Sequence, residues 1–135
     1  MASYEGLTQR AARTVSWSLD ADTAGVATAR RLTKEALIRW GCDALVDDAQ
    51  LVVTELVTNA ILHSESDCKV TIDLGDQYLR IAVTDSGGGV PEPQPFDLTR
   101  EGGRGLLIVS TLAQAWGVIP AQGARGKTVW AELVA

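Results

Sequence analysis

Three polar side chains recur every fourth residue in the otherwise apolar segment ELVTNAILHS, at Glu55, Asn59 and His63. Residues four apart lie almost above one another on a helix, so the three would form one row, turned only about 60° from the apolar row through Leu56. Such a row borders the core. Because asparagine competes for backbone hydrogen bonds inside a helix, a group outside the helix is expected to use Asn59. The alternative is a boundary row whose polar groups are satisfied by neighbouring loops.

A second candidate site begins in the segment DSGGG, where an apolar strand pattern ends. Asp85 closes that pattern, and Gly87, Gly88 and Gly89 have no side chains to keep another molecule away from the backbone. A carboxylate in this place can accept a hydrogen bond from an exocyclic amino group. The alternative is an ordinary glycine-rich turn.

A third candidate is the segment GGRGLLIV, which places Gly102, Gly103 and Gly105 at the expected start of a helix. The unpaired N–H groups and the positive dipole end there favour an anion such as phosphate. The segment AQGARGKT, in contrast, only ends like a phosphate-binding P-loop. Ala121 occupies its first required glycine position and the segment leads into a strand, so we reject a Walker-type site.

The spacing of apolar residues predicts the elements that must position these groups. Alternation predicts strands over 14–19, 69–74, 78–85, 117–120 and 128–135. Steps of three and four predict helices from 22 or 23 to about 40 and from 43 to about 63, and an apolar run predicts a buried helix over 106–116. We expect Asp22 or Thr23 to cap the first helix, Gly41 to end it, and Asp43 to cap the second.

A long proline- and glycine-rich segment, residues 86–105, lies between the predicted strand at 78–85 and the predicted helix at 106–116. Its composition predicts a loop. Loops of that length in a small domain are usually functional or disordered. The resulting order of strands and helices predicts an α+β fold, a two-layer sandwich in which helices cover one face of a mixed, mostly antiparallel sheet.

Composition narrows the class of protein. A chain of 135 residues suits a single domain, expected over 14–135 after a flexible polar leader at 1–13. Seventeen acidic against 12 basic residues, with no basic cluster, argue against nucleic acid as a partner. The absence of a long apolar run or signal-peptide core argues against membrane insertion and makes the cytoplasm the expected location. Cys42 and Cys68 show no metal or disulfide pattern and are expected to be reduced packing residues.

Four boxes in order resemble the ATP-binding fold of the GHKL superfamily, which includes gyrase, the heat-shock chaperone, histidine kinases and mismatch-repair ATPases. The boxes are Glu55-x-x-x-Asn59, Asp85-x-Gly87-x-Gly89, Gly103-x-Gly105 and Gly126-x-Thr128. The resemblance covers nearly the whole chain after residue 14. The small size and the segment ELVTNAILH resemble most closely the bacterial anti-sigma-factor serine kinases of that superfamily.

This resemblance implies ATP and Mg²⁺ as cofactors, with Asn59 binding the Mg²⁺ that bridges the phosphates and Glu55 acting as the general base toward a partner's serine. Asp85 would receive the adenine amino group with Thr128 nearby, and the amides of Gly103 and Gly105 would hold phosphate. The implied nucleotide-binding set is Asn59, Asp85, Gly87, Gly89, Gly102, Gly103, Arg104, Gly105, Leu106 and Thr128. Arg100 and Arg104 could contact phosphates across a short, proline-rich lid, whereas His63 is expected to be a structural residue.

The implied partners are a sigma factor and an anti-sigma-factor antagonist that the chain phosphorylates. One alternative is a nucleotide-binding interaction module of the same fold without phosphotransfer, and another is a detached histidine-kinase catalytic domain. Retention of an acid at Glu55 favours the serine kinase. A homodimer could form through the apolar first strand and Trp17, although burial of Trp17 against the first helix is the favoured use of that side chain.

Overall fold

The computed structural model describes residues 13–20, 22–64, 67–87, 101–121 and 126–135. Within them, five strands form one sheet in the order β1-β2-β3-β5-β4, and every pairing is antiparallel. The strands are β1 (Thr14–Leu19), β2 (Cys68–Leu74), β3 (Tyr78–Asp85), β4 (Ala115–Pro120) and β5 (Lys127–Val134). The described helices are α2 (Thr23–Arg39), the short 3₁₀ helix η1 (Asp43–Leu45), α3 (Val46–Ser64) and α4 (Glu101–Leu112).

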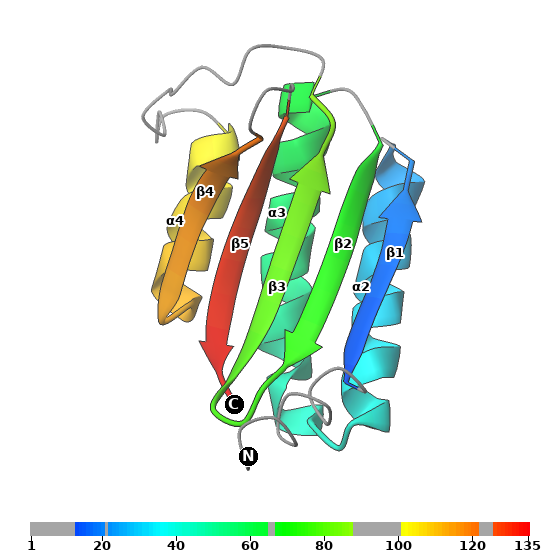
Figure 1. The fold of residues 1–135 in the computed structure, drawn as a ribbon, viewed down its shortest axis with the longest axis vertical. Helices are drawn as coiled ribbons and strands as arrows, with labels where there is room; N and C mark the ends of the chain where they lie inside the picture. Colours follow the sequence, from blue (N-terminus) through cyan, green and yellow to red (C-terminus); the bar gives the residue numbers. More distant parts are fainter. Residues whose placement is uncertain (1–12, 21, 65–66, 88–100, 122–125) are drawn as a thin grey trace.

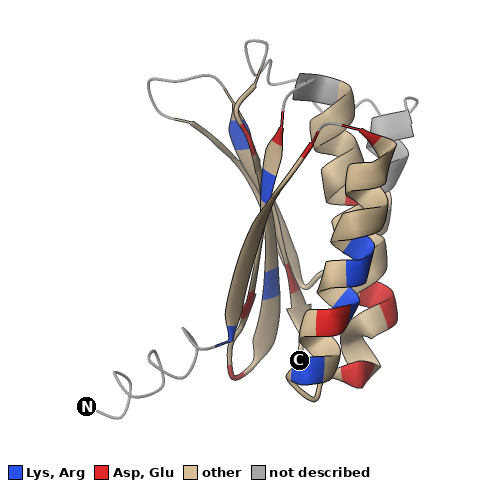
Figure 2. Ribbon diagram, turned by 90° about the vertical axis from the view of Figure 1, so that its right-hand side faces the viewer, with Lys and Arg blue, Asp and Glu red and all other residues tan. Residues whose placement is uncertain are grey.

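The three α-helices lie side by side on one face of the sheet (Figure 1), and the edge-on view in Figure 2 shows the two layers. This arrangement confirms the predicted α+β sandwich. The sequence predicted a mixed, mostly antiparallel sheet, whereas every described pairing is antiparallel. None of the described helices is both long and apolar enough to cross a membrane.

The core lies between the two layers and follows the predicted alternation. In β2 and β3 the helix-facing aliphatic side chains are all buried; they are Val70, Ile72, Leu74, Leu79, Ile81 and Val83. The turn between these strands is closed by a hydrogen bond from the Gly75 amide to the Tyr78 carbonyl oxygen, at 2.9 Å. Trp17 of β1 packs against the same core from its edge. Each fully buried branched side chain contributes about 1.5–3 kcal/mol, so this alternation alone fixes which face of the sheet the helices cover.

Helix α2 begins and ends as predicted. The Asp22 carboxylate accepts a hydrogen bond from the Gly25 amide at 2.8 Å and so caps the first turn. At the other end Gly41 has a φ of 75°, which allows the Cys42 amide to bond back to the Leu37 carbonyl oxygen at 2.8 Å. This hydrogen-bonded stop turns the chain directly toward α3.

Helix α3 is the central helix, and its predicted apolar stripe is buried against β3, β2 and β5. The buried members of the stripe are Ala49, Val52, Val53, Leu56, Val57 and Ala60, and its last member, Ile61, is partly buried against the same core. The predicted cap at Asp43 is wrong, because Asp43 is the first residue of η1 and α3 itself begins at Val46. The aspartate still lies near the positive end of the helical segment, where a negative charge is favourable.

Helix α4 differs from its prediction at both ends. It begins at Glu101, within the segment predicted to be a loop, and it ends at Leu112 instead of Trp116. Burial of Leu106 and Val109 outweighs the cost of glycine in a helix, which is about 1 kcal/mol per residue. The early end arises because the Gln114 amide bonds to Glu132 of β5, at 2.8 Å, and the chain then enters β4.

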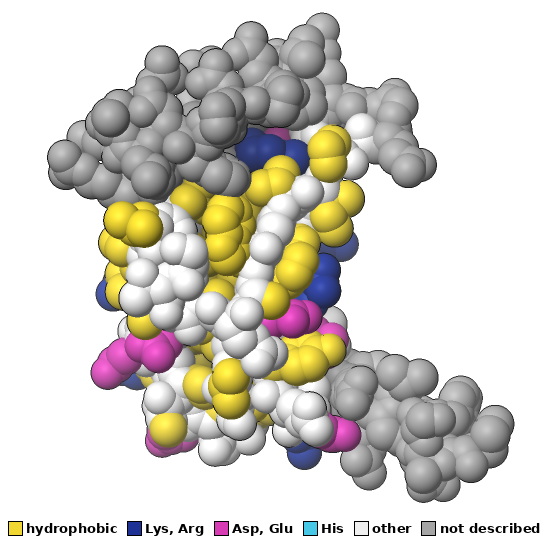
Figure 3. All heavy atoms as spheres, turned by 90° about the vertical axis from the view of Figure 1, so that its left-hand side faces the viewer, with side chains coloured by type: hydrophobic (Ala, Val, Ile, Leu, Met, Phe, Trp, Pro, Cys, Tyr) yellow, Lys and Arg dark blue, Asp and Glu magenta, His cyan; other side chains and the backbone are white. Residues whose placement is uncertain are grey.

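The α4–β4 edge of the sandwich exposes apolar side chains, as Figure 3 shows from that side. They belong to Leu107 on α4 and to Val118 and Ile119 on β4. Residues 1–12 of the predicted leader 1–13, residues 88–100 of the proline-rich segment and residues 122–125 before β5 lie outside the described residues.

Candidate nucleotide site

Four elements that carry the predicted site residues meet at one end of the sandwich. The end of β3, the start of β5, the last turns of α3 and the first turn of α4 all lie at the top of Figure 1. The chain directions require this, since β3 and α3 run toward that end whereas β5 and α4 start from it. The structure therefore brings Asp85, Asn59 and the glycines of α4 to the same end of the fold.

Asp85 is the last residue of β3 and is almost wholly buried, with 3% of its surface exposed. It continues the helix-facing row of Ile81 and Val83, so its carboxylate lies in the layer between sheet and helices. Its Oδ2 atom accepts a hydrogen bond from the Lys127 ammonium group at 3.0 Å. Its Oδ1 atom has no hydrogen-bond partner among the described residues. Since buried polar atoms are nearly always paired, this oxygen is a ready acceptor for a donor group on a ligand.

Gly126 brings the start of β5 against the end of β3. Its φ of 109° is a backbone conformation that side-chain-bearing residues rarely adopt. A Cβ atom at this position would overlap the carbonyl oxygen of Asp85 and touch the Ser86 backbone. The glycine is thus required for the close approach that places Lys127 opposite Asp85 in the strand register.

Thr128 lies on the other face of the sheet from the Asp85 carboxylate. Its hydroxyl forms a hydrogen bond of 2.8 Å with the hydroxyl of Thr84, its register partner on β3, on the face that the helices do not cover. The structure therefore does not bring this hydroxyl and the Asp85 carboxylate together, and it places Lys127 there instead. Sequence reasoning missed Lys127. Side chains two residues apart on a strand share a face, so the inward-facing Val129 already indicates that Lys127 points to the helix side.

Cys68 is the register partner of Asp85 on β2 and is also buried. Burial first, and then the negative charges of Asp85 and Asp67, raise the pKa of the Cys68 thiol to about 11 from 9.0. The side chain is therefore a neutral thiol at physiological pH, and a protonated, buried thiol is a poor nucleophile. This agrees with the expectation of a packing residue, and both cysteines are free of disulfides.

Asn59 and Glu55 are one turn apart on α3 and differ in exposure. Asn59 is 6% exposed, whereas Glu55 is only partly buried. Among the described residues, no three His, Cys, Asp or Glu side chains are grouped so that they could hold a metal ion. An Mg²⁺ ion that keeps waters and nucleotide phosphates as its other ligands needs only one or two protein oxygens, so a single amide oxygen from Asn59 fits it. The side chain of His63 lies outside the described part.

Gly102, Gly103 and Gly105 lie in the first turns of α4, and Leu106 anchors that end of the helix in the core at 3% exposure. The first N–H groups of the helix have no partner within the helix and can bind phosphate oxygens. Gly87 precedes this region with a φ of 61° at the end of the described β3 segment. Gly89, Arg100 and the side chain of Arg104 lie outside the described residues.

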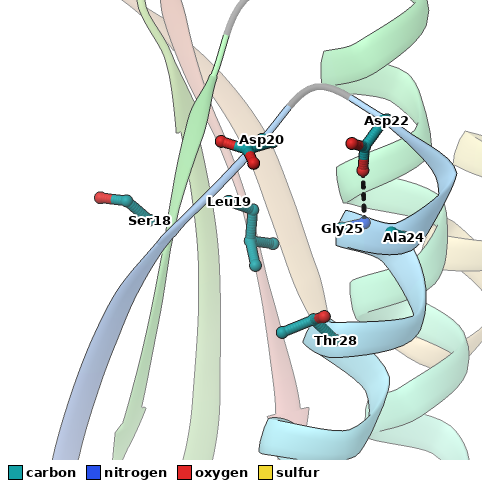
Figure 4. A pocket seen from close by; sticks show the side chains of 7 residues that line it. All are labelled: Ser18, Leu19, Asp20, Asp22, Ala24, Gly25 and Thr28. Atoms are coloured by element: carbon teal, nitrogen blue, oxygen red, sulfur yellow. Dashed lines mark hydrogen bonds between the residues drawn. The ribbon is translucent and has the colours of Figure 1, made fainter.

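A separate hollow of about 210 Å³ opens between the end of β1 and the start of α2 (Figure 4). Asp20, Asp22 and Gly25 are among its lining residues, and the dashed contact in the figure is the cap of α2 described above. None of the predicted nucleotide-binding residues lines it. Because it holds none of those residues, and because the Asp22 carboxylate in it already caps α2, this hollow is not the candidate site.

Comparison with known families agrees with this geometry. A model of the histidine kinase-like ATPase domain matches residues 19–133, which is most of the chain. No curated protein sequence matches. The matched region contains both the end of β3 and the start of β5, where Asp85 and Lys127 meet. The chain therefore belongs to the histidine kinase-like ATPase domain family, whose members bind ATP, usually with Mg²⁺.

Proposed function

We propose that the chain is an ATP-dependent protein serine/threonine kinase that acts as an anti-sigma factor and phosphorylates an anti-sigma-factor antagonist. The observation that carries this proposal is the placement of two polar residues on α3. Asn59 is buried where it can hold a nucleotide's metal ion, whereas Glu55, one turn earlier, is open enough to meet a second substrate. A module that only bound nucleotide would have no use for an acid in that place.

The proposed reaction transfers the γ-phosphoryl group to a serine of the partner. The serine oxygen forms a bond to the γ-phosphorus, its proton passes to the Glu55 carboxylate, and the bond from phosphorus to the bridging oxygen breaks to release ADP. When bound, Mg²⁺ supplies charge neutralisation on the phosphates. The rest is positioning, which in phosphoryl transfer accounts for most of the catalysis.

In this proposal each group holds one part of ATP. Asp85 accepts a hydrogen bond from the exocyclic amino group of adenine at its free Oδ1 atom. The amides at the start of α4 hold phosphate oxygens, and Asn59 faces the metal ion. The three groups come from β3, α4 and α3, so the nucleotide would lie across the end of the sandwich and beside Glu55.

Transfer of label from [γ-³²P]ATP to a co-purified partner tests the proposal. We expect the tagged native chain to phosphorylate one associated protein on serine or threonine, located by mass spectrometry. The Glu55→Gln variant should bind Mg-ATP with unchanged affinity and transfer at least about a hundredfold less phosphate, as expected for loss of a general base. Normal ATP binding with no transfer to any associated protein would instead leave the nucleotide-binding interaction module as the function.

A further inference from the structure

Lys127 forms an ion pair with Asp85 inside the candidate site. Its side chain is 18% exposed, that of Asp85 is 2% exposed, and Nζ lies 3.0 Å from Oδ2. The pair is held by the strand register, in which Asp85 lies opposite Lys127 on one side and Cys68 on the other. The lysine thus occupies one carboxylate oxygen and leaves the other, Oδ1, without a partner among the described residues.

Burial of a charged carboxylate is very costly unless a positive charge is paired with it, and Lys127 is the cation that the structure pairs with Asp85. The Cys68 thiol on the opposite side is neutral and cannot replace the positive charge of Lys127. The protonation state determines hydrogen bonding, since an ionised carboxylate only accepts hydrogen bonds whereas a carboxylic acid can also donate one.

We propose that Lys127 is a positioning and specificity-determining residue that keeps Asp85 as a pure acceptor and thereby selects adenine nucleotides over purine nucleotides with an oxygen in place of the amino group. Adenine presents an N–H donor to Oδ1, whereas hypoxanthine and guanine present a carbonyl oxygen there. Two acceptors facing each other in a buried site leave both unsatisfied, which excludes the oxygen-bearing bases. This inference rests on the proposed role of Asp85 in binding adenine.

Calorimetric titration of the intact chain with Mg-ATP and with Mg-inosine triphosphate tests the inference, because the two bases differ in their exocyclic group. The ratio of the two dissociation constants is the readout, and it requires no phosphotransfer, so it is independent of the kinase proposal. We expect Lys127→Met to lower the preference for ATP by at least about tenfold. Lys127→Arg keeps the cation and should keep the preference.

Any one of three results would overturn the inference. The first is a Lys127→Met chain that loses equal affinity for both nucleotides, or none, which would mean that the lysine only supports the fold. The second is an Asp85→Asn chain with an unchanged ratio, which would remove Asp85 from base recognition. If Lys127→Met does not fold, Lys127→Gln provides the comparison, because its amide can donate to Oδ2 without a charge. A fully retained preference in Lys127→Gln would exclude the proposed role of the cation.

Discussion

The main chain at Gly126 lies against the carbonyl oxygen of Asp85, closer than any residue with a Cβ atom could approach. This contact places the first residue of β5 beside the last residue of β3. The glycine, although it has no side chain to offer a ligand, therefore determines the position of the Lys127 ammonium group.

Substitution of Gly126 by alanine should damage both stability and nucleotide binding. The positive φ and the overlap with Asp85 together should lower the free energy of unfolding by about 2–4 kcal/mol. Urea denaturation measures this loss, and titration with Mg-ATP measures the affinity. Gly41→Ala is a matched control, because Gly41 also has a positive φ but has open space around it. We expect that control to lose about 1 kcal/mol and no affinity; equal effects of both substitutions would refute a special role for the Gly126 contact.

Replacement of Asn59 by alanine should remove the Mg²⁺-dependent part of ATP affinity. We expect at least a tenfold weaker affinity in the presence of Mg²⁺, because the amide is the protein oxygen placed to ligand the ion. In EDTA the variant and the native chain should bind ATP equally. Gln50→Ala, on the same helix, removes a surface hydrogen bond to the Arg30 carbonyl oxygen and should change neither value. An Asn59→Ala chain with native affinity in Mg²⁺ would exclude the metal assignment.

Substitution of Thr128 by valine should leave ATP affinity unchanged, because its hydroxyl bonds to Thr84 on the face away from Asp85. Loss of that hydrogen bond should cost about 1 kcal/mol of stability. Calorimetry and urea denaturation of the same preparation separate the two effects. A clear loss of affinity without a loss of stability would instead support the role of Thr128 in nucleotide binding that the resemblance implied.

Stability should decline in alkaline solution through Cys68. The pKa of this thiol is about 11 in the folded chain, against 9.0 for the ordinary thiol. Between these values the folded chain holds the proton that the unfolded chain releases, so the free energy of unfolding falls as the pH rises from 9 to 11. The full loss is at most about 2–3 kcal/mol and is absent below pH 9.

Cys68→Ala provides the reference for this alkaline effect, since other groups also titrate in that range. The difference in unfolding free energy between native chain and variant should be constant up to pH 9 and shrink above it. A difference that stays constant to pH 11 would show that Cys68 does not titrate differently on folding.

Most of the fold could be predicted because its buried residues recur at the regular intervals expected for strands and helices. Alternation in β2 and β3, and steps of three and four in α2 and α3, leave little choice of register or face. The start of α4 could not be predicted in this way. Three glycines lower its intrinsic helix propensity, and only the tertiary burial of Leu106 and Val109 stabilises a helix there.

The candidate site was only partly predictable, because the motifs do not say to which face of a strand each side chain points. Asp85 could be identified because it ends an apolar alternation, and Asn59 because an amide is unusual inside a helix. The neighbour of Asp85 could not be taken from the motif alone: Thr128 and Lys127 are adjacent in sequence, and a shift of one residue moves a side chain to the opposite face of a strand. The inward phase of Val129, Ala131 and Leu133 identifies Lys127 as the residue that faces the core.

A crystal structure of the chain with Mg²⁺ and a non-hydrolysable ATP analogue tests the central claim most directly. We expect the exocyclic amino nitrogen of adenine about 3 Å from Oδ1 of Asp85, and the amide oxygen of Asn59 about 2.1 Å from Mg²⁺. Lys127 should remain bonded to Oδ2, and Glu55 should face the γ-phosphate across a space that a serine side chain can enter. Adenine bound elsewhere, with Oδ1 of Asp85 contacting no part of the nucleotide, would contradict the account.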